Sequence, residues 1–555
     1  MTASALIRIT KNTFALSLAR MGIVAFTVVF TIFAARVLGV EGFGKYALVR
    51  GYFELFLSLA STGLAIVITR EIAKRVEWTA RYLSTAFALV AGLALASTTL
   101  LAILGRGFDY ASDTELALWL ASLALFPAAG AALVEGAFIA AEKAEYVTVG
   151  TIIENILRTA LSLWALFAGH GLFALFVVLF VTRSVMVGFY LATLHLRVAK
   201  LRWYFDWTFM KQLVRDWRVF ALENWFSTLF LSLGVIILSL FHGERAVGPY
   251  AAADRILTPV GLFAGSYRDA IFPYLSRSFQ ESRDAIHRVT EQSVKYMLAL
   301  VLPGAILISV LADTIIRLLY TDAYAESVPI LRVLVWVLVL RFTNPFLSFT
   351  LFARGEQTTS LKVAAISFAV YLAVSLWMIP QWGAVGTAGS LLLAMFAAFL
   401  LYFFFVFGTA RARETLSNIT RIALAAGITG VFATALRDSG LNLPLLVTSI
   451  AALYILLLFA LRVPSQGDMD LFRRMAAKLS ANLSVIARSV LSGAAFFAAE
   501  SKDRDEAISN SRIGDCFAHL PWQAVPGKNA RNDIREDSPD EPRPRGFADN
   551  RKTAE

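Results

Sequence analysis

Apolar windows of about 20 residues recur from residue 13 to residue 462 of this 555-residue chain. Each window is long enough to cross a hydrocarbon core of about 30 Å as a helix. Hydrophobic residues make up 58% of the chain and charged residues only 16%, whereas soluble proteins carry about 25% charged residues. The sequence therefore predicts an all-α integral membrane protein that crosses the membrane many times.

We predict about fourteen membrane-spanning helices, at 13–36, 46–68, 82–104, 114–140, 147–168, 171–195, 218–241, 248–275, 293–319, 328–353, 361–380, 384–408, 419–437 and 442–462. With the N-terminus placed in the cytoplasm, the inner loops hold about 21 Lys and Arg residues and the outer loops about four. Because basic residues concentrate on the cytoplasmic side, this bias predicts a multi-pass protein of the cytoplasmic (inner) membrane with both termini in the cytoplasm.

The composition changes after Pro464. Residues 464–500 form a basic amphipathic segment that suits an anionic inner membrane surface. Residues 501–555 are polar and poor in aliphatic side chains, which predicts a disordered cytoplasmic tail. The net charge of +11 is thus a property of the inner loops and the tail, and it does not indicate a nucleic-acid partner.

A short hinge sequence occurs twice, about 200 residues apart. The spacing G-x4-G-x-Y-A begins at Gly39 and again at Gly243, and its second glycines are Gly44 and Gly248. Each copy joins the first and second helices of a six-helix set, and glycine permits the tight, positive-φ turn that such a connection needs. Both copies fall on the outer side, so the two halves share one orientation and are related by an axis along the membrane normal.

Further stretches carry a family resemblance. Residues 12–74 resemble the opening of the polysaccharide-type flippases in the multidrug/oligosaccharidyl-lipid/polysaccharide (MOP) exporter superfamily. The stretches "GERAVGPYAAADRI" with "FPYLSR" (243–277), "IIRLLYTDAYAESVPILRVL" (315–334) and "WGAVGTAGS" (382–390) resemble the same family. The resemblance covers residues 8–462, and the tail lies outside it.

This resemblance implies two six-helix bundles, at 1–200 and 201–410, followed by an additional helix pair at 411–463. It also implies a central cavity and alternating access. The implied cargo is an isoprenoid-diphosphate-linked oligosaccharide that moves from the cytoplasmic to the outer leaflet, and other polysaccharide-assembly proteins are possible partners. The expected pathway is the assembly of an exopolysaccharide, a capsule or the O-antigen of lipopolysaccharide.

Ionisable residues at membrane depth are the candidate site, because each is costly unless it is paired or hydrated. Arginine suits a diphosphate, since its planar fork donates two parallel hydrogen bonds and stays ionised. By the rise per residue, three arginines lie at mid-depth and three are shallower. The candidate cavity residues are Arg158, Arg183 and Arg341 at mid-depth, and Arg20, Arg50 and Arg255 nearer the ends of their helices.

Acidic neighbours offer a competing, structural explanation for some of these arginines. Two arginines have an acidic residue four positions away, which places each pair on one helix face: Arg50 with Glu54, and Arg158 with Glu154. Asp254 is the sequence neighbour of Arg255. These pairs can be internal salt bridges rather than substrate contacts. Two arginines, at 183 and 341, have no acidic neighbour within one turn, which favours the cavity. Glu223 is a weaker candidate for binding a coupling cation.

The sequence argues against an enzyme and against a cofactor or a metal site. The chain has no G-x4-G-K-[ST] phosphate-binding loop, its five histidines have no metal spacing, and Cys516 is its lone cysteine. Four alternatives stay open: a peptidoglycan-precursor flippase, a drug or cation exporter of the same superfamily, a membrane polymerase or ligase, and a non-transporting scaffold. Basic residues at mid-depth disfavour the cation exporter, and short outer loops disfavour the polymerase.

Overall fold

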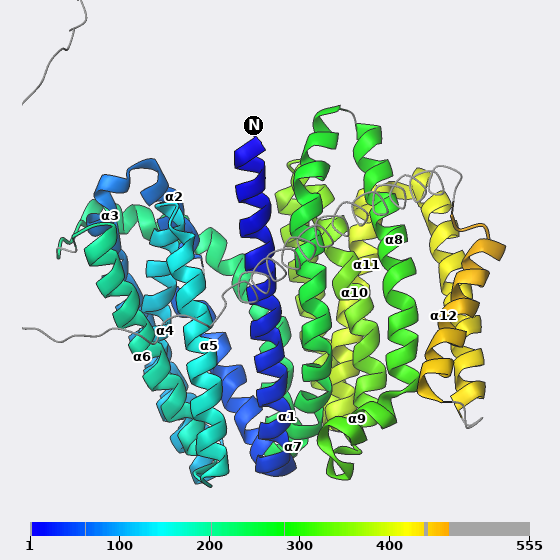
Figure 1. Cartoon of the computed structure of the whole chain (residues 1–555), viewed down its shortest axis with the longest axis horizontal. Coiled ribbons are helices and arrows are strands. Elements are labelled where there is room, and N and C mark those ends of the chain that lie inside the picture. Colours follow the sequence, from blue (N-terminus) through cyan, green and yellow to red (C-terminus); the bar gives the residue numbers. More distant parts are fainter. Residues whose placement is uncertain (1–2, 62, 201–202, 282, 438–441, 465–555) are drawn as a thin grey trace, which may run out of the picture. The chain divides into compact units, whose positions relative to one another are not determined.

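The computed structural model describes residues 3–61, 63–200, 203–281, 283–437 and 442–464. Within these helices, the side chains of several stretches lie outside the description, chiefly 3–25, 219–224, 262–285 and 409–412. The predicted amphipathic segment at 465–500 and the predicted tail at 501–555 lie outside the described residues. Every described element of regular structure is a helix (Figure 1).

The helices begin and end as follows: α1 Ala3–Ser61, α2 Leu64–Lys74, the 3₁₀ turn η1 Val76–Trp78, α3 Thr79–Gly107, α4 Ser112–Ala140, α5 Ala144–Phe167, α6 Gly171–Arg197, α7 Trp207–Glu281, α8 Arg283–Val310, α9 Ala312–Tyr320, η2 Asp322–Tyr324, α10 Ser327–Ala353, α11 Gln357–Arg437 and α12 Leu443–Ala460.

Three of these helices are longer than one membrane crossing, and each is interrupted by glycine. The breaks lie at Gly39 in α1, at Gly243 in α7, and at Gly383 and Gly408 in α11, with φ angles of 68°, 76°, 52° and 60°. Glycine adopts positive φ far more readily than other residues do. The breaks fall between or at the ends of predicted spans, so the chain turns where the sequence indicated.

Two predicted spans are interrupted where no break was expected. The span at 46–68 contains the junction between α1 and α2, where Gly63 has φ 85°. The span at 293–319 is divided at Leu311 into α8 and the short α9. Both windows are apolar on average, and an averaged hydropathy does not respond to a backbone turn inside such a stretch.

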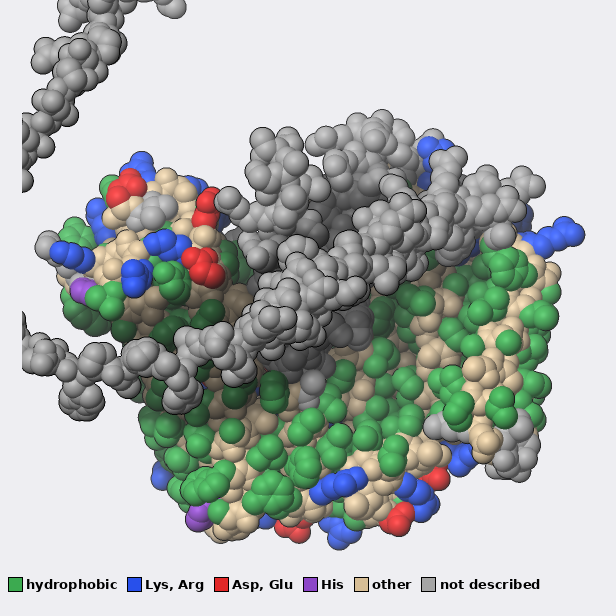
Figure 2. All heavy atoms as spheres, in the orientation of Figure 1, with side chains coloured by type: hydrophobic (Ala, Val, Ile, Leu, Met, Phe, Trp, Pro, Cys, Tyr) green, Lys and Arg blue, Asp and Glu red, His purple; other side chains and the backbone are tan. Residues whose placement is uncertain are grey.

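Apolar surface confirms the membrane class. In the described part of the chain, nine helices are long and apolar enough to cross a membrane. Figure 2 shows a broad band of hydrophobic side chains, with Lys, Arg, Asp and Glu gathered toward the two ends of the helices. The protein is therefore a multi-pass, all-helical membrane protein, and the count of fourteen spans stays a prediction.

The helices gather around α1 and α7, which pack against each other more extensively than any other pair. In Figure 1, α3 to α6 lie on one side of this pair and α8 to α12 on the other. One apolar core joins α2, α3, α4 and α6, and it includes Phe209 and Leu213 from the first turns of α7. A larger core is centred on α1, α7, α8, α10 and α11. The start of α7 thus packs against the N-terminal helices.

Candidate functional site

The two glycine hinges contact each other directly. A Cβ atom at Gly44 would overlap the carbonyl oxygen of Glu244, and a Cβ atom at Gly248 would overlap the carbonyl oxygen of Val40. Both neighbours are backbone atoms, so only glycine permits this approach. The second glycine of each hinge is therefore required by the close packing of α1 on α7.

This contact is reciprocal. The offset of 204 residues that separates Gly39 from Gly243 maps Val40 onto Glu244 and Gly44 onto Gly248. The two close approaches are therefore the same contact made twice, with the roles of the helices exchanged. Exchange of this kind is the signature of a two-fold axis. The hinge contact supports the predicted pseudo-two-fold relation between the halves.

A cavity of about 640 Å³ lies on the same pseudo-axis, between α1, α7 and α10. Five residues of α1 line it together with the five residues of α7 that lie 204 positions later: Ala47 with Ala251, Arg50 with Asp254, Gly51 with Arg255, Glu54 with Thr258, and Leu57 with Gly261. Its volume is typical of a ligand site. The repeat thus produces a central cavity with equivalent walls but different charges.

Three arginines line this central cavity: Arg50 on α1, Arg255 on α7 and Arg341 on α10. Arg50 has acidic and phenolic neighbours, with its Nε 3.6 Å from Glu54 Oε1 and its Nη1 3.4 Å from the Tyr46 hydroxyl. Neither Arg255 nor Arg341 forms an ion pair with any carboxylate whose side chain the structure describes. Arg255 nevertheless interacts electrostatically with Asp254 and Glu54, which line the same cavity.

A smaller pocket of about 60 Å³ adjoins the central cavity, and Arg50 and Glu54 line both. Arg158 and Arg183 also line this pocket. Both interact with Glu154, which is only 5% exposed: Arg158 Nη1 lies 3.7 Å from one carboxylate oxygen and Arg183 Nη1 lies 3.2 Å from the other. One buried carboxylate therefore holds two arginines at the side of the cavity.

The arrangement at Glu154 corrects the sequence argument for Arg183. That argument counted acidic neighbours on the same helix, whereas the partner of Arg183 lies on α5, 29 residues earlier. Arg183 therefore both lines a pocket and forms an ion pair. Its Nε is buried without a hydrogen-bond partner among the described groups, and such an unsatisfied donor in a native structure calls for a functional or structural reason.

The sequence analysis also missed Glu135. It lies on α4 and interacts electrostatically with Arg183 and Glu154. The signal was present, because Glu135 falls inside the predicted span at 114–140, where an ionisable side chain is unexpected. Of the other predicted residues, Asp254 and Glu54 line the central cavity. Arg20 and Glu223 lie in α1 and α7, but their side chains are outside the described set, so their roles stay predictions.

A polar cluster links the two halves beside the hinges. Lys45, which is 11% exposed, lies 3.0 Å from Asp113, 3.2 Å from Glu41 and 3.8 Å from Glu244. Glu244 also accepts a hydrogen bond of 3.2 Å from the backbone N–H of Ala111. These contacts join the N-terminal helices to the second hinge at the hinge end of the molecule.

The first hinge is further held by η2. The hydroxyl of Tyr324 donates to the carbonyl oxygens of Ala35 and Gly39, at 2.9 and 3.0 Å. A helix break leaves carbonyl groups without intrahelical partners, and the single O–H of Tyr324 is shared between these two. Tyr324 belongs to the stretch at 315–334 that carries the family resemblance, so one part of that stretch has a structural role.

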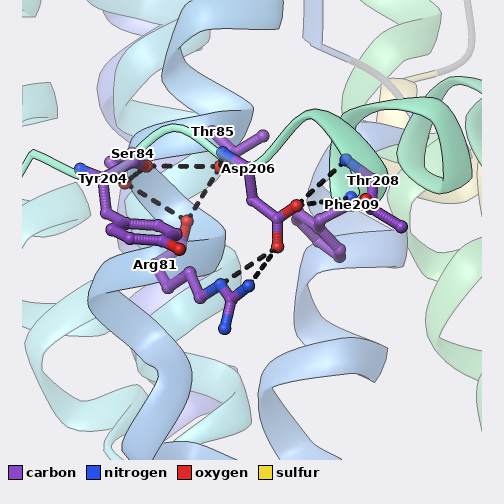
Figure 3. Close-up of polar contacts among 7 residues, drawn as sticks. All are labelled: Arg81, Ser84, Thr85, Tyr204, Asp206, Thr208 and Phe209. Atoms are coloured by element: carbon purple, nitrogen blue, oxygen red, sulfur yellow. Dashed lines mark hydrogen bonds and ion pairs between the residues drawn. The ribbon is translucent and has the colours of Figure 1, made fainter.

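The connection from α6 to α7 is attached to α3, as Figure 3 shows. Arg81 donates two hydrogen bonds to Asp206 Oδ2, at 3.0 and 2.6 Å. The other oxygen of Asp206 accepts from the backbone N–H groups of Thr208 and Phe209, which caps α7. The Phe209 N–H bond and the Arg81 guanidinium together hold the pKa of Asp206 below its ordinary value of 3.8.

Comparison with known families identifies the fold. A family model described as "Lipid II flippase MurJ" matches residues 177–460, which is more than half of the chain. The chain belongs to the MurJ family, within the MOP exporter superfamily. A second model, described as "Polysaccharide biosynthesis protein", matches residues 9–279. Together the two models cover almost the whole region that the sequence resemblance covers.

Curated relatives of this MurJ-family chain match over shorter segments. The capsular polysaccharide biosynthesis protein CapF of Staphylococcus aureus is 25% identical over 171 residues, which are 31% of this chain and 43% of CapF. The probable lipid II flippase MurJ of Rhizobium meliloti is 28% identical over 201 residues, which are 33% of this chain and 37% of that protein. The matches thus span less than half the length of these relatives.

Solved structures share the fold of this MurJ-family chain. A lipid II flippase MurJ in an inward closed conformation aligns with a TM-score of 0.67 and 15% identity, over 81% of this chain and 98% of that one. An inward-facing MATE-family multidrug transporter of the MOP superfamily aligns with a TM-score of 0.58 and 17% identity, over 72% and 98%. The all-helical MOP fold predicted from the sequence is confirmed.

Proposed function

We propose that this chain is a flippase that moves a polyprenyl-diphosphate-linked oligosaccharide repeat unit from the inner to the outer leaflet of the cytoplasmic membrane. The repeat unit would serve the assembly of an exopolysaccharide, a capsule or an O-antigen. The observation that carries the proposal is the central cavity, to which both halves contribute arginines. Arg50 comes from the first half, and Arg255 and Arg341 come from the second.

The chemistry of the cavity fits a diphosphate headgroup. An arginine fork binds phosphate oxygens in pairs, and such charge-assisted bonds are about twice as strong as neutral ones. Arg255 and Arg341 form no ion pair among the described residues, although Arg255 interacts electrostatically with Asp254 and Glu54. Arg158 and Arg183, in contrast, are held by Glu154. We assign the primary diphosphate contact to the central cavity and a secondary contact to the smaller pocket beside it.

The membrane potential supplies a driving force for such a cargo. A headgroup with two negative charges that leaves an inside-negative cell gains about 2.3 kcal/mol per charge per 100 mV, or roughly 4.6 kcal/mol in total. Export therefore does not require nucleotide hydrolysis in this chain. Alternating access would expose the cavity to one leaflet at a time, while the polyprenyl chain stays in the bilayer.

A peptidoglycan-precursor flippase is the second candidate. The observation that favours it is the "Lipid II flippase MurJ" model, which matches residues 177–460. The polysaccharide model instead matches residues 9–279, which hold the first half and part of the second, and CapF supports a polysaccharide cargo. Both cargoes carry a sugar on a polyprenyl diphosphate, so the arginine cavity serves either, and the experiment must compare them.

The proposal is tested by leaflet transfer in proteoliposomes. A fluorescent polyprenyl-diphosphate oligosaccharide and a lipid II analogue are each placed in vesicles, and a membrane-impermeant reagent reports which leaflet holds the headgroup. Arg341→Gln should slow transfer about 10- to 150-fold, since it removes a charge-assisted bond worth about 1.5–3 kcal/mol. Arg332→Gln is the matched control, because Arg332 lies on the same helix but is exposed and outside the cavity.

Faster transfer of the oligosaccharide than of the lipid II analogue supports the first candidate, and the reverse order supports the second. If Arg341→Gln and Arg255→Gln both transfer the cargo as fast as wild type, the central arginines do not bind the headgroup. If wild-type vesicles transfer neither lipid at any applied potential, the chain is not a flippase of this class.

A further inference from the structure

The connection between α6 and α7 presents a row of aromatic side chains that the proposed function does not use. Residues 203–207 have the sequence WYFDW. Trp203, Phe205 and Trp207 are 89%, 55% and 61% exposed, and the rings of Phe205 and Trp207 lie 6.0 Å apart. A single exposed apolar residue is ordinary, but a contiguous exposed group indicates an interaction surface.

The backbone of this segment and the Asp206 side chain are bound to α3, while the aromatic side chains, including Tyr204 at 51%, stay exposed. Tyr204 exchanges hydrogen bonds with Ser84: its N–H donates to Ser84 Oγ, and its carbonyl oxygen accepts from the same hydroxyl. The N–H of Asp206 donates to Thr85 Oγ1, and its carboxylate accepts from Arg81. Figure 3 shows both residues directed at α3. The segment is therefore fixed to α3, with its aromatic side chains more than half exposed.

The attachment points place this row at a definite depth. Arg81, Ser84 and Thr85 lie in the first turns of α3, which runs from Thr79 to Gly107 and has 29 residues. At 1.5 Å per residue such a helix is about 44 Å long, whereas the hydrocarbon core is about 30 Å thick. The helix thus exceeds the core by about 14 Å, and we place its charged first turn, with Arg81, in the interfacial layer, the depth at which tryptophan is enriched in membrane proteins.

Basic residues continue the same surface along α7. Lys211 and Arg215 follow Trp207 at four and eight residues, and both are exposed. The Lys211 ammonium lies 5.7 Å from the ring centroid of Trp207. The other face of these turns is apolar and buried through Phe209 and Leu213. The first turns of α7 thus present an aromatic and basic face outward.

We propose that residues 203–215 form a lipid-binding surface, occupied by the headgroup layer of a leaflet that contains anionic glycerophospholipids. The three aromatic side chains insert at the interface, and Lys211 and Arg215 bind lipid phosphates. Charge complementarity selects anionic lipid, because each basic residue near such a surface adds to the attraction. The surface fixes the depth of the connection between the two halves, and this inference does not depend on the identity of the cargo.

The test uses a fluorescent label at the centre of the row. In a Cys516→Ser background, Phe205→Cys carries an environment-sensitive fluorophore in full-length protein, reconstituted with or without phosphatidylglycerol. Lipids with a nitroxide at the headgroup, or aqueous iodide, serve as quenchers. A label at Trp203→Cys is measured in parallel. The matched control is Glu77→Cys, an exposed polar position in the turn just before α3.

We expect a blue-shifted label at 205 that nitroxide lipids quench and iodide does not, while the label at 77 shows the opposite. Phosphatidylglycerol should strengthen the lipid quenching. Lys211→Gln and Arg215→Gln should each weaken the apparent affinity for phosphatidylglycerol about fivefold, whereas Lys362→Gln, an exposed lysine on α11, should not.

Three results would overturn the proposal. Quenching of the 205 and 203 labels by iodide alone would place the row in water. Protection from both quenchers would mean that protein covers the row. If the extent of lipid quenching is the same with and without phosphatidylglycerol, and is unchanged by the Lys211 and Arg215 substitutions, the surface does not select anionic lipid.

Discussion

Alanine at either second hinge glycine should force the two hinges apart. The added methyl group of Gly248→Ala would overlap the carbonyl oxygen of Val40, and that of Gly44→Ala would overlap the carbonyl oxygen of Glu244. Both obstacles are backbone atoms, so no side-chain rotation relieves them and α1 must move away from α7. By the reciprocity of the contact, the two substitutions should act in the same direction and to a similar extent.

The magnitude follows from two opposing terms. Overpacking of a tight contact costs about 1–3 kcal/mol, and alanine returns at most about 1 kcal/mol through its higher helix propensity. Because both obstacles are backbone atoms, the cost lies at the upper end of this range, and the net cost to the state in which the hinges touch is about 2 kcal/mol. This corresponds to about a thirtyfold shift toward states in which the hinges are separated.

The separation is measured by spin labels at Glu41→Cys and Arg245→Cys, two exposed hinge positions, in a Cys516→Ser background. Electron paramagnetic resonance then gives the distribution of distances between the hinges. We expect both alanine variants to populate longer distances than wild type. Gly92→Ala is the control, because a Cβ at Gly92 on α3 meets nothing within 4 Å.

The reasoning is refuted if both hinge variants give the wild-type distance distribution and the wild-type melting temperature. In that case the backbone contact between the hinges does not exist in the membrane. A change in only one variant would refute the reciprocity, and with it the pseudo-two-fold relation drawn from these residues.

Other substitutions probe the charged clusters. Glu154→Gln should lower the free energy of unfolding by about 3 kcal/mol, seen as a lower melting temperature, because it leaves Arg183 without its buried partner; an unchanged melting temperature would contradict the pairing. Lys45→Gln should lengthen the same hinge distances, since it removes the cation that Glu244 faces. Unchanged hinge distances would contradict this role of Lys45. Asp206→Asn should destabilise the protein at neutral pH. Because the folded-state pKa of Asp206 is lowered, its contribution is complete above about pH 4 and is lost as the pH falls through the folded value. Melting curves of the two proteins should therefore converge in acid, and a constant difference would exclude this cause.

The membrane class, the repeat and the central arginines could be predicted from the sequence because each depends on local composition. Spans follow from apolar windows, and the breaks at Gly39 and Gly243 follow from repeated glycines. Arg255 and Arg341 could be selected because an ionisable side chain at membrane depth is costly wherever the helix packs. These features need no knowledge of which helices are neighbours.

The remaining features depend on helix packing, which one sequence does not encode in any local pattern. The pairing of Arg183 with Glu154 joins two helices, and neighbour counting along a single helix cannot detect it. The second hinge glycines, Gly44 and Gly248, fit the repeat. Their role in the backbone contact can be recognised only when the packing of α1 on α7 is known. The attachment of Asp206 to Arg81 joins residues 125 positions apart, so no local motif indicates it.

We propose above that the arginine cavity carries a diphosphate headgroup across the bilayer. Wild-type proteoliposomes are used to compare the transfer of two lipids that have the same polyprenyl chain and the same oligosaccharide. In the first lipid a diphosphate links the chain to the sugar, and in the second the linkage is neutral. We expect transfer of the diphosphate lipid, accelerated by an inside-negative potential, and little transfer of the neutral lipid. Equal transfer of both lipids would contradict the proposal.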